Sequence, residues 1–208
     1  MKYETKQLLC RGLFAGLMIA IGCMVYLACE NKLVGALLFS AGLFFILSNN
    51  GALLTGMCGL PTPWLTLAAV LAFNAAGALL GGILSWPAQR LAEPAAALVA
   101  NKLAASPLSW LTNGILCGVL MYLAVMGFKR AAEGVLSLAS VMYAIPVFIV
   151  AGFEHSIADL GYLAIAIPAL SWTQVAGMLG MILVVVAGNV IVSKLIRICL
   201  EDAQRQKP

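Results

Sequence analysis

Ionisable side chains interrupt an apolar region in the last third of the chain. The stretch 151–160 holds the only histidine, His155, and its Glu154 and Asp159 are the only charged residues within 134–193. Ionisable groups inside an apolar segment are costly, so they are a functional hypothesis by default. A histidine, with an unperturbed pKa of about 6.5, exchanges a proton near physiological pH. This stretch therefore predicts a site that stabilises charge or transfers a proton.

The composition predicts an integral membrane protein. Of the 208 residues, 63% are hydrophobic and 10% are charged, and the mean hydropathy is +1.03. A soluble domain carries about 25% charged residues, so this chain lacks the polar side chains to cover a water-exposed surface. The net charge of +4 comes without a basic cluster interleaved with aromatic residues, which argues against a nucleic-acid partner. The six cysteines form no CxxC motif, and we expect mostly small buried side chains there.

Six apolar segments predict an all-α fold with six transmembrane helices, the first of which is retained because no cleavage site follows it. Four segments have the length of one span, about 20 residues. These are 8–28, 64–86, 108–128 and 171–198. The other two, 33–60 and 134–169, are too long for one span and carry polar residues near their middles, at 48–51 and 154–156. We therefore expect helices 2 and 5 to be broken.

The two halves share this plan of three spans with a broken middle helix. Three is an odd number, so the halves must lie inverted relative to each other. We expect one membrane domain, 1–208, with inverted repeats at about 8–86 and 108–198. The outer loop 87–107 joins them, and it is alanine-rich with room for a short interfacial helix. Paired broken helices place a binding or conduction site near the bilayer midplane.

One asparagine lies in the third segment of each half, Asn74 and Asn189. A broken helix frees N–H and C=O groups that hydrocarbon cannot satisfy, and a side-chain amide both donates and accepts hydrogen bonds. We expect Asn74 and Asn189 to hold the two breaks along the substrate pathway. Ordinary hydrogen bonds between helices are the alternative.

The basic residues predict that both termini are cytoplasmic. With the N-terminus inside, the outer loops hold three of them, Lys32, Arg90 and Lys102. The inner loops and tails hold nine, namely Lys2, Lys6, Arg11, Lys129, Arg130, Lys194, Arg197, Arg205 and Lys207. This excess follows the positive-inside rule, so we expect a multi-pass protein of the plasma (inner) membrane.

Several blocks of the sequence resemble the formate/nitrite transporter family, over about residues 10–195. The specific match is Gly152-Phe153-Glu154-His155-Ser156-Ile157-Ala158, which is similar to the signature of the family's fifth helix. Residues 52–55 resemble the loop that interrupts the second helix, and 74–78 and 188–189 resemble the third and sixth helices. Lys102 precedes the fourth helix, as the family's lysine does.

This resemblance implies an aquaporin-like fold and a homopentamer in the lipid bilayer with one pore in each protomer. It implies passage of small monovalent anions, such as formate, nitrite, hydrosulfide or short monocarboxylates. It also implies two apolar constrictions flanking the histidine, which by position include Phe39, Leu43, Leu54 and Phe148. The chain departs from the family pattern at Ala52, Leu54, Gly118 and Asp159, so the substrate does not carry over directly.

The function that we expect is passive or proton-coupled transport of such an anion or its neutral acid. Desolvation opposes the passage of an anion through an apolar constriction, but not that of a neutral acid. Lys102 would concentrate anions at the outer mouth, unless it is a plain surface charge. His155 would supply a positive field or a proton, and Thr55 would bond to it across the pore or else within its own loop. Glu154 would orient His155 or cap freed N–H groups, and capping is favoured.

Other function classes fit the sequence less well. An aquaporin-type channel for neutral small solutes fits the broken helices, but 49–51 and 154–156 read Asn-Asn-Gly and Glu-His-Ser instead of Asn-Pro-Ala. An enzyme would need a nucleophile–base pair or a metal cluster, whereas the chain has one histidine and no HExxH motif. We expect no enzyme, metal or cofactor. A non-transporting assembly or sensor protein predicts no flux.

Overall fold

The computed structural model describes residues 3–88, 90–131 and 134–205, and these residues form helices without any strand. Lys2 and Lys207, which were counted among the basic residues of the inner side, lie outside the described residues. The elements in chain order are α1 (Tyr3–Ala28), α2 (Lys32–Ser48), α3 (Leu54–Met57), α4 (Trp64–Ser85), η1 (Trp86–Ala88), α5 (Ala92–Leu103), α6 (Pro107–Arg130), α7 (Val135–Val150), α8 (Ser156–Ala166), η2 (Ile167–Ala169) and α9 (Trp172–Arg205).

Four helices are long and apolar enough to cross a membrane. They are α1, α4, α6 and α9, while α2, α7 and α8 are apolar but shorter. Large apolar side chains are exposed on the outside of the protein, for example Leu65, Val135 and Trp172, each more than four-fifths exposed. This distribution suits a multi-pass membrane protein, because lipid tails replace the missing polar surface.

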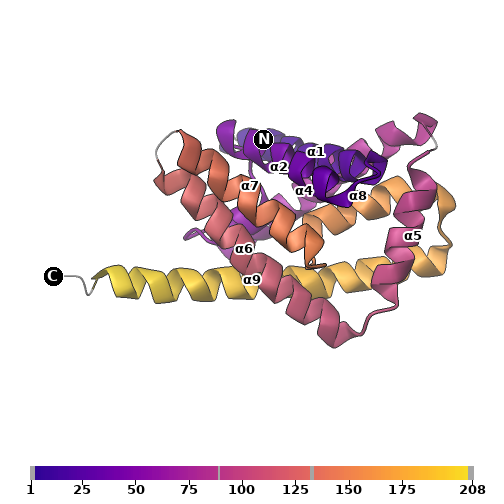
Figure 1. The fold of residues 1–208 in the computed structure, drawn as a ribbon. Helices are drawn as coiled ribbons and strands as arrows, with labels where there is room; N and C mark the ends of the chain where they lie inside the picture. Colours follow the sequence, from indigo (N-terminus) through magenta and orange to yellow (C-terminus); the bar gives the residue numbers. More distant parts are fainter. Residues whose placement is uncertain (1–2, 89, 132–133, 206–208) are drawn as a thin grey trace.

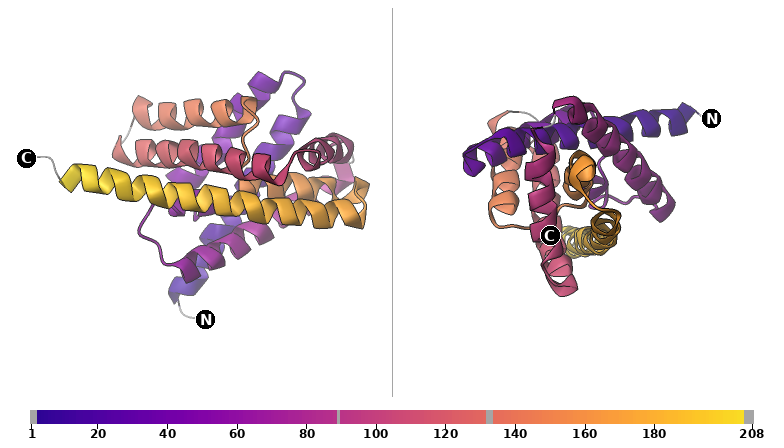
Figure 2. Two further views of the ribbon diagram at one scale, coloured as in Figure 1. Left: turned by 90° about the horizontal axis from the view of Figure 1, so that it is seen from below. Right: turned by 90° about the vertical axis from the view of Figure 1, so that its right-hand side faces the viewer.

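The helices pair most extensively within each half of the chain. In the first half α1 packs on α4 and on α2, and in the second half α6 packs on α9 and on α7. The α9 helix runs past the other helices at its C-terminal end, and α5 lies across the opposite end of the protein (Figure 1). In the second set of views α6 and α7 lie side by side next to α9 (Figure 2).

Glycines let α1 and α4 approach closely. A Cβ atom at Gly77 would lie 2.1 Å from the carbonyl oxygen of Leu13, and one at Gly16 would lie 2.0 Å from that of Asn74. Both distances are far below van der Waals contact, so only glycine fits at these crossings. Small residues serve this purpose at helix contacts within membranes. The close approach brings the backbone of α1 within reach of the Asn74 side chain.

Residues 49–53 separate the α2 helix from the next helical turn, α3. The last residue of α2 is Ser48, and Asn50 follows with a φ of 52°, which is the left-handed region. The chain then runs extended through Leu53 into the single turn of α3 at Leu54. The helical element that follows the break is therefore only one turn long. The polar residues 48–51 stop the helix because Asn and Gly tolerate a left-handed backbone.

The α7 and α8 helices are separated by residues 151–155. Gly152 has a φ of 73°, which again favours glycine, and α8 begins at Ser156. Unlike α3, α8 is a helix of 11 residues, nearly all of them buried. The polar stretch singled out in the sequence thus forms the connection between these two helices and the first turn of the second one.

The loop 87–107 contains α5, as its alanine content predicted. This helix does not lie free on a surface, because it packs on α8, α9 and η2 and buries Ala95 and Val99. Its C-terminal end is fixed by the indole N–H of Trp110, which donates to the carbonyl oxygen of Lys102 over 2.9 Å. The packing of α5 on α8 is what brings Lys102 to the stretch 151–160.

Candidate functional site

His155 occupies the N-cap position of α8. Its Nδ1 atom accepts a hydrogen bond from the backbone N–H of Ala158 over 3.1 Å, and only 2% of the residue is exposed. A helix begins with N–H groups that lack partners, so a side-chain acceptor at this position stabilises its start. Because Nδ1 accepts, the neutral ring carries its proton on Nε2. The cap thereby selects the tautomer.

Thr55 meets His155 from the other half of the chain. Its Oγ1 atom lies 3.0 Å from Nε2 of His155, and the threonine is fully buried in the first turn of α3. Since Nε2 carries the proton, His155 donates this hydrogen bond and Thr55 accepts it. The hydrogen bond expected between these two residues is present, and the hydroxyl hydrogen of Thr55 has no second partner among the described residues.

Aromatic rings cover the imidazole. The ring of Phe148, from the last turns of α7, stacks on His155 with centroids 5.7 Å apart and planes inclined by 21°. Phe39, from α2, meets Phe148 edge to face with centroids 6.4 Å apart. Both phenylalanines are buried, as is Leu43 one turn further along α2. The expected apolar residues Phe39, Leu43 and Phe148 therefore lie buried, and the ring of Phe148 lies between the histidine and Phe39 in this series of ring contacts.

The two asparagines bind the two breaks in the same manner. Oδ1 of Asn74 accepts the N–H of Leu54 over 2.8 Å, and its Nδ2 donates to the carbonyls of Ala52 and Gly12. Oδ1 of Asn189 accepts the N–H of Ser156 over 3.0 Å. Its Nδ2 donates to the carbonyls of Glu154 and Gly114. Each amide thus fixes the N–H that opens a short helix and the carbonyl two residues earlier, which is the role that the sequence predicted.

Lys102 forms ion pairs with two carboxylates. Its Nζ atom contacts Oε2 of Glu154 and lies 3.0 Å from Oδ1 of Asp159, and 14% of the lysine side chain is exposed. Lys102 belongs to α5, which is outside the helices that could span a membrane. Burial favours the neutral amine, but the charges of Asp159 and Glu154 outweigh it and raise the pKa of Lys102 above its ordinary value. The lysine is therefore a buried cation and not a plain surface charge.

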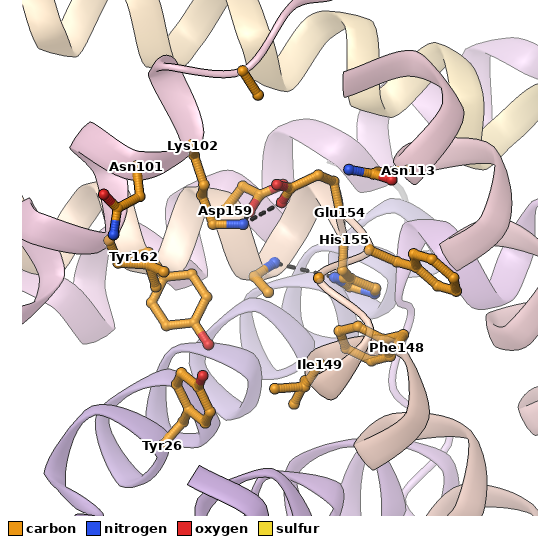
Figure 3. A pocket seen from close by; sticks show the side chains of 15 residues that line it. Tyr26, Asn101, Lys102, Asn113, Phe148, Ile149, Glu154, His155, Asp159 and Tyr162 are labelled. Atoms are coloured by element: carbon orange, nitrogen blue, oxygen red, sulfur yellow. Dashed lines mark hydrogen bonds and ion pairs between the residues drawn. The ribbon is translucent and has the colours of Figure 1, made fainter. Parts of the chain in front are cut away.

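A cavity of about 290 Å³ opens beside this cluster, and we call it the α5 cavity. Its polar lining includes Lys102, Glu154, His155 and Asp159, and its walls include the rings of Phe148 and Tyr162. The side chains of Lys102, Glu154 and Asp159 point toward one another, with Tyr26 and Tyr162 on one side and Phe148 below His155 (Figure 3). The cavity volume suits a small ion with a few water molecules.

A second cavity, of about 90 Å³, lies on the α3 side, and we call it the α3 cavity. Its lining includes Leu53 and Gly56, which flank Thr55 in sequence, and the two cations Arg11 and Lys129, but no acidic residue. The two cavities share no lining residue. His155 lines the α5 cavity, and its hydrogen-bond partner Thr55 is the neighbour in sequence of Gly56, which lines the α3 cavity.

A sequence model of the formate/nitrite transporter family matches residues 1–200. The chain belongs to the formate/nitrite transporter family. Two solved structures share its fold. One, described as an FNT family ion channel, has a TM-score of 0.79 at 20% identity and covers 93% of this chain and 86% of that chain. The other, described as a pentameric formate channel with formate bound, has a TM-score of 0.85 at 19% identity and covers 100% of both chains. No curated protein matches the sequence.

One expectation for this family member needs correction. Glu154 does not cap freed N–H groups with its carboxylate, because Nδ1 of His155 makes the cap and the carboxylate binds Lys102. Asp159 is 1% exposed beside the same lysine. Leu54 lines an apolar cavity between α4 and α9, and its neighbour Leu53 lines the α3 cavity, so the place of Leu54 in a pore constriction stays a prediction.

The departure at Gly118 has a packing explanation. A Cβ atom at this position would lie 2.4 Å from Cγ1 of Val192 and 2.9 Å from the carbonyl oxygen of Asn189. The α9 helix thus fills the space that a larger residue would need. Gly118 does not widen a passage, and its carbonyl accepts a hydrogen bond from the hydroxyl of Ser193 over 3.3 Å.

Some residues of the site were not predicted from the sequence. Tyr26, Asn113 and Tyr162 line the α5 cavity, and Arg11 lines the α3 cavity. Arg11 was visible only as a basic residue of the N-terminal tail. The tyrosines lie within apolar helices, where one aromatic residue looks like another. Only the packing of α1 on α8 reveals that Tyr26 and Tyr162 meet, with ring centroids 6.2 Å apart.

Proposed function

We propose that this protein transports a small monovalent anion, such as formate, nitrite, hydrosulfide or a short monocarboxylate, through a pore in each protomer. The observation that carries the proposal is the contact between Thr55 and His155, which connects a lining residue of the α5 cavity to the sequence neighbour of Gly56 in the lining of the α3 cavity. A solved structure of the same fold is described as a pentameric formate channel with formate bound. We extend its pentameric assembly and its ligand class to this chain.

The pathway runs between the two halves of one membrane domain, 1–208. In this proposal the repeats 8–86 and 108–198 are inverted, with six crossings in all, and 87–107 connects them on the outer side. Helices α2 with α3 and α7 with α8 are the two broken crossings. The termini are cytoplasmic, in the plasma (inner) membrane, so that the α5 cavity faces outward and the α3 cavity inward. The matching hydrogen bonds of Asn74 and Asn189 support this symmetry.

Transport follows from the charges along this pathway. Lys102 attracts the anion into the α5 cavity, where the local field is stronger than in bulk water. The apolar rings of Phe39 and Phe148 then oppose the passage of a charged species, since an unpaired charge in an apolar environment is costly. The permeant crosses as the neutral acid, or with an accompanying proton. His155 is the central polar group: Nε2–H donates to Thr55 at rest and to an oxygen of the permeant during passage.

Proton exchange at His155 has a structural cost. The imidazole becomes a cation only when Nδ1 takes a proton, and Nδ1 already accepts the N–H of Ala158. A permeant that releases its proton at this point must therefore displace the helix cap or exchange through Nε2 alone. Arg11 and Lys129 in the α3 cavity then attract the anion that re-forms on the inner side.

The test is formate uptake into proteoliposomes that contain the full chain, measured from pH 5 to pH 8. His155→Asn keeps a polar side chain but loses the Nε2–H donor, and we expect uptake to fall at least about tenfold with an altered pH profile. An unchanged rate and pH profile would contradict the role of His155. Osmotic swelling with water and glycerol is the companion assay, and swelling without formate uptake would favour a channel for neutral solutes.

A further inference from the structure

One lysine serves two carboxylates in the α5 cavity. Nζ of Lys102 contacts Glu154 and lies 3.0 Å from Oδ1 of Asp159, and the two acidic side chains are 8% and 1% exposed. With all three groups ionised, the cluster carries a net charge of −1. A buried ion pair is tolerated when its charges balance, and an excess buried charge is strongly unfavourable.

Asp159 is the less satisfied of the two acids. Both of its oxygens are buried, Oδ1 has the ion pair with Lys102, and Oδ2 has no hydrogen-bond partner among the described residues. Glu154, in contrast, accepts a hydrogen bond from Lys102. A buried polar atom without a partner calls for an explanation, such as a proton or a ligand.

The other groups around Asp159 supply no second positive charge. His155 is held neutral by its cap, with Nε2 turned to Thr55. The remaining titratable groups that face Asp159 come from α1, α5, α6, α8 and the connection before α8. They are Cys23, Tyr26, Lys102, Cys117, Tyr162 and Glu154. Among them only Lys102 is a cation. A proton on Asp159 is then the simplest way to balance the cluster.

We propose that Asp159 holds a proton at rest and donates it to the anion that reaches Lys102 in the α5 cavity. The O–H bond of Asp159 breaks, its electron pair stays on the carboxylate, and a lone pair of the anion forms the new O–H bond of the neutral acid. The Asp159 carboxylate takes the place of the anion beside Lys102, so the charge of the cluster is conserved. Water on the same side then returns a proton to Asp159, and one proton crosses with each anion.

This inference rests on the proposed function and adds the proton donor to it. It also separates two tasks that a single histidine would otherwise have to perform. Asp159 neutralises the anion before it reaches the ring of Phe148, and Nε2–H of His155 guides the neutral acid past it. The order matters, because the charged cluster lies within the α5 cavity, whereas the ring of Phe148 in its wall packs on the buried ring of Phe39.

The first test measures the proton directly. The chain contains only two aspartates, Asp159 and Asp202, so aspartate labelled with ¹³C makes the carboxyl band of Asp159 identifiable in the infrared spectrum. At pH 7 we expect a protonated-carboxyl band that shifts with the label and is absent in Asp159→Asn. In Glu154→Gln, Asp159 is the only acid left beside Lys102, so it should lose its proton and the same band should disappear. A purely structural aspartate would show no such response to Glu154.

The second test measures transport in proteoliposomes with formate as the probe and a pH-sensitive dye inside. In Asp159→Asn we expect uptake at pH 7.5 to fall at least about tenfold, because a positioned proton donor is lost. The deficit should narrow at pH 5, where bulk water supplies more of the neutral acid. Asp159→Glu should retain most of the rate, and it replaces the amide variant if that one fails to fold. Glu93→Gln, an exposed acid on α5, is the matched control with unchanged uptake.

The outcomes are distinct. A labelled protonated band in the wild type, lost in Glu154→Gln, supports the proposal, as does the pH-dependent deficit of Asp159→Asn. The absence of that band between pH 5 and pH 7, or uptake by Asp159→Asn with the wild-type pH profile, would overturn it. A wild-type protein that carries no formate would overturn the proposed function instead, and the infrared band would still decide whether Asp159 holds a proton.

Discussion

Nε2 of His155 lies 3.0 Å from Oγ1 of Thr55, although the two residues are 100 positions apart in the chain. The contact joins the first turn of α3 to the N-cap of α8, so each half of the protein contributes one partner. Nδ1 of His155 is already an acceptor, which makes Nε2 the donor and leaves the Thr55 hydroxyl with a hydrogen to offer. His155 is therefore the donor and Thr55 the acceptor in a hydrogen bond that joins the two halves of the protein.

Thr55→Val tests this pair. The variant removes the acceptor for Nε2–H, and a buried donor without a partner costs about 1–3 kcal/mol, so both the unfolding midpoint in detergent and formate uptake should fall. Thr55→Ser keeps the hydroxyl and should restore both. Thr112→Val on α6 removes a hydroxyl that bonds only within its own helix, and it should change neither value appreciably. Equal behaviour of the valine variants at 55 and 112 would contradict the pairing.

Asn189→Ala tests the break between α7 and α8. The substitution leaves the N–H of Ser156 and two carbonyls without their partner, and we expect a loss of about 2–5 kcal/mol in unfolding free energy. Amide hydrogen exchange should rise at the start of α8. Asn74→Ala should produce the same effect at the start of α3. The stability control is Asn101→Ala, whose side chain is exposed. A loss no greater than that of the control would show that the break holds without the amide.

Lys102→Gln tests the buried cation. Because the carboxylates raise the pKa of Lys102, the lysine remains charged below its unfolded pKa of about 10.4 and loses its contribution only above that pH. The titration of the lysine itself therefore adds no pH dependence between pH 5 and pH 9. Removing it leaves two buried acids without a cation, at a cost of about 3–5 kcal/mol.

The penalty of Lys102→Gln should be smaller at pH 5 than at pH 8, since protons then neutralise the acids in place of the lysine. Denaturant unfolding at the two pH values measures the difference. Lys6→Gln, an exposed lysine of α1, should change stability by less than about 1 kcal/mol at either pH. A penalty that is the same at both pH values would contradict the charge balance described for the α5 cavity.

Phe148→Ala tests the apolar ring beside the histidine. Removing the ring should raise uptake of lactate relative to formate, because the ring that covers the imidazole also limits the size of the permeant. The same change should lower stability by about 3–5 kcal/mol, as expected for a large side chain lost from a core. Phe45→Ala, at a half-exposed position on α2, is the control and should leave the lactate-to-formate ratio unchanged. An unchanged ratio in Phe148→Ala would remove this ring from the pathway.

Much of the site could be predicted from the sequence, because the features that mark it depend on only a few neighbouring residues. A histidine in an apolar segment indicates a functional site. The helices stop at 48–51 and 151–155 because residues there favour a left-handed or irregular backbone. The family signature at 152–158 added the expected class of permeant. Side-chain direction was less accessible. The capping role given to Glu154 was wrong because it depended on a side-chain orientation that spacing does not specify.

The sequence by itself determined the membrane environment, the positions at which the helices stop, and the family. These properties depend on composition and on backbone preferences that act over a few residues. Only the tertiary structure decided that Lys102 stands between Glu154 and Asp159, and that Thr55 meets His155. Such contacts depend on how α5 packs on α8 and how the two halves meet, and the energy of a buried charge depends on every partner within a few ångströms. A lysine that could have been a surface charge became, through that packing, the only cation beside two buried acids among the residues that the structure describes.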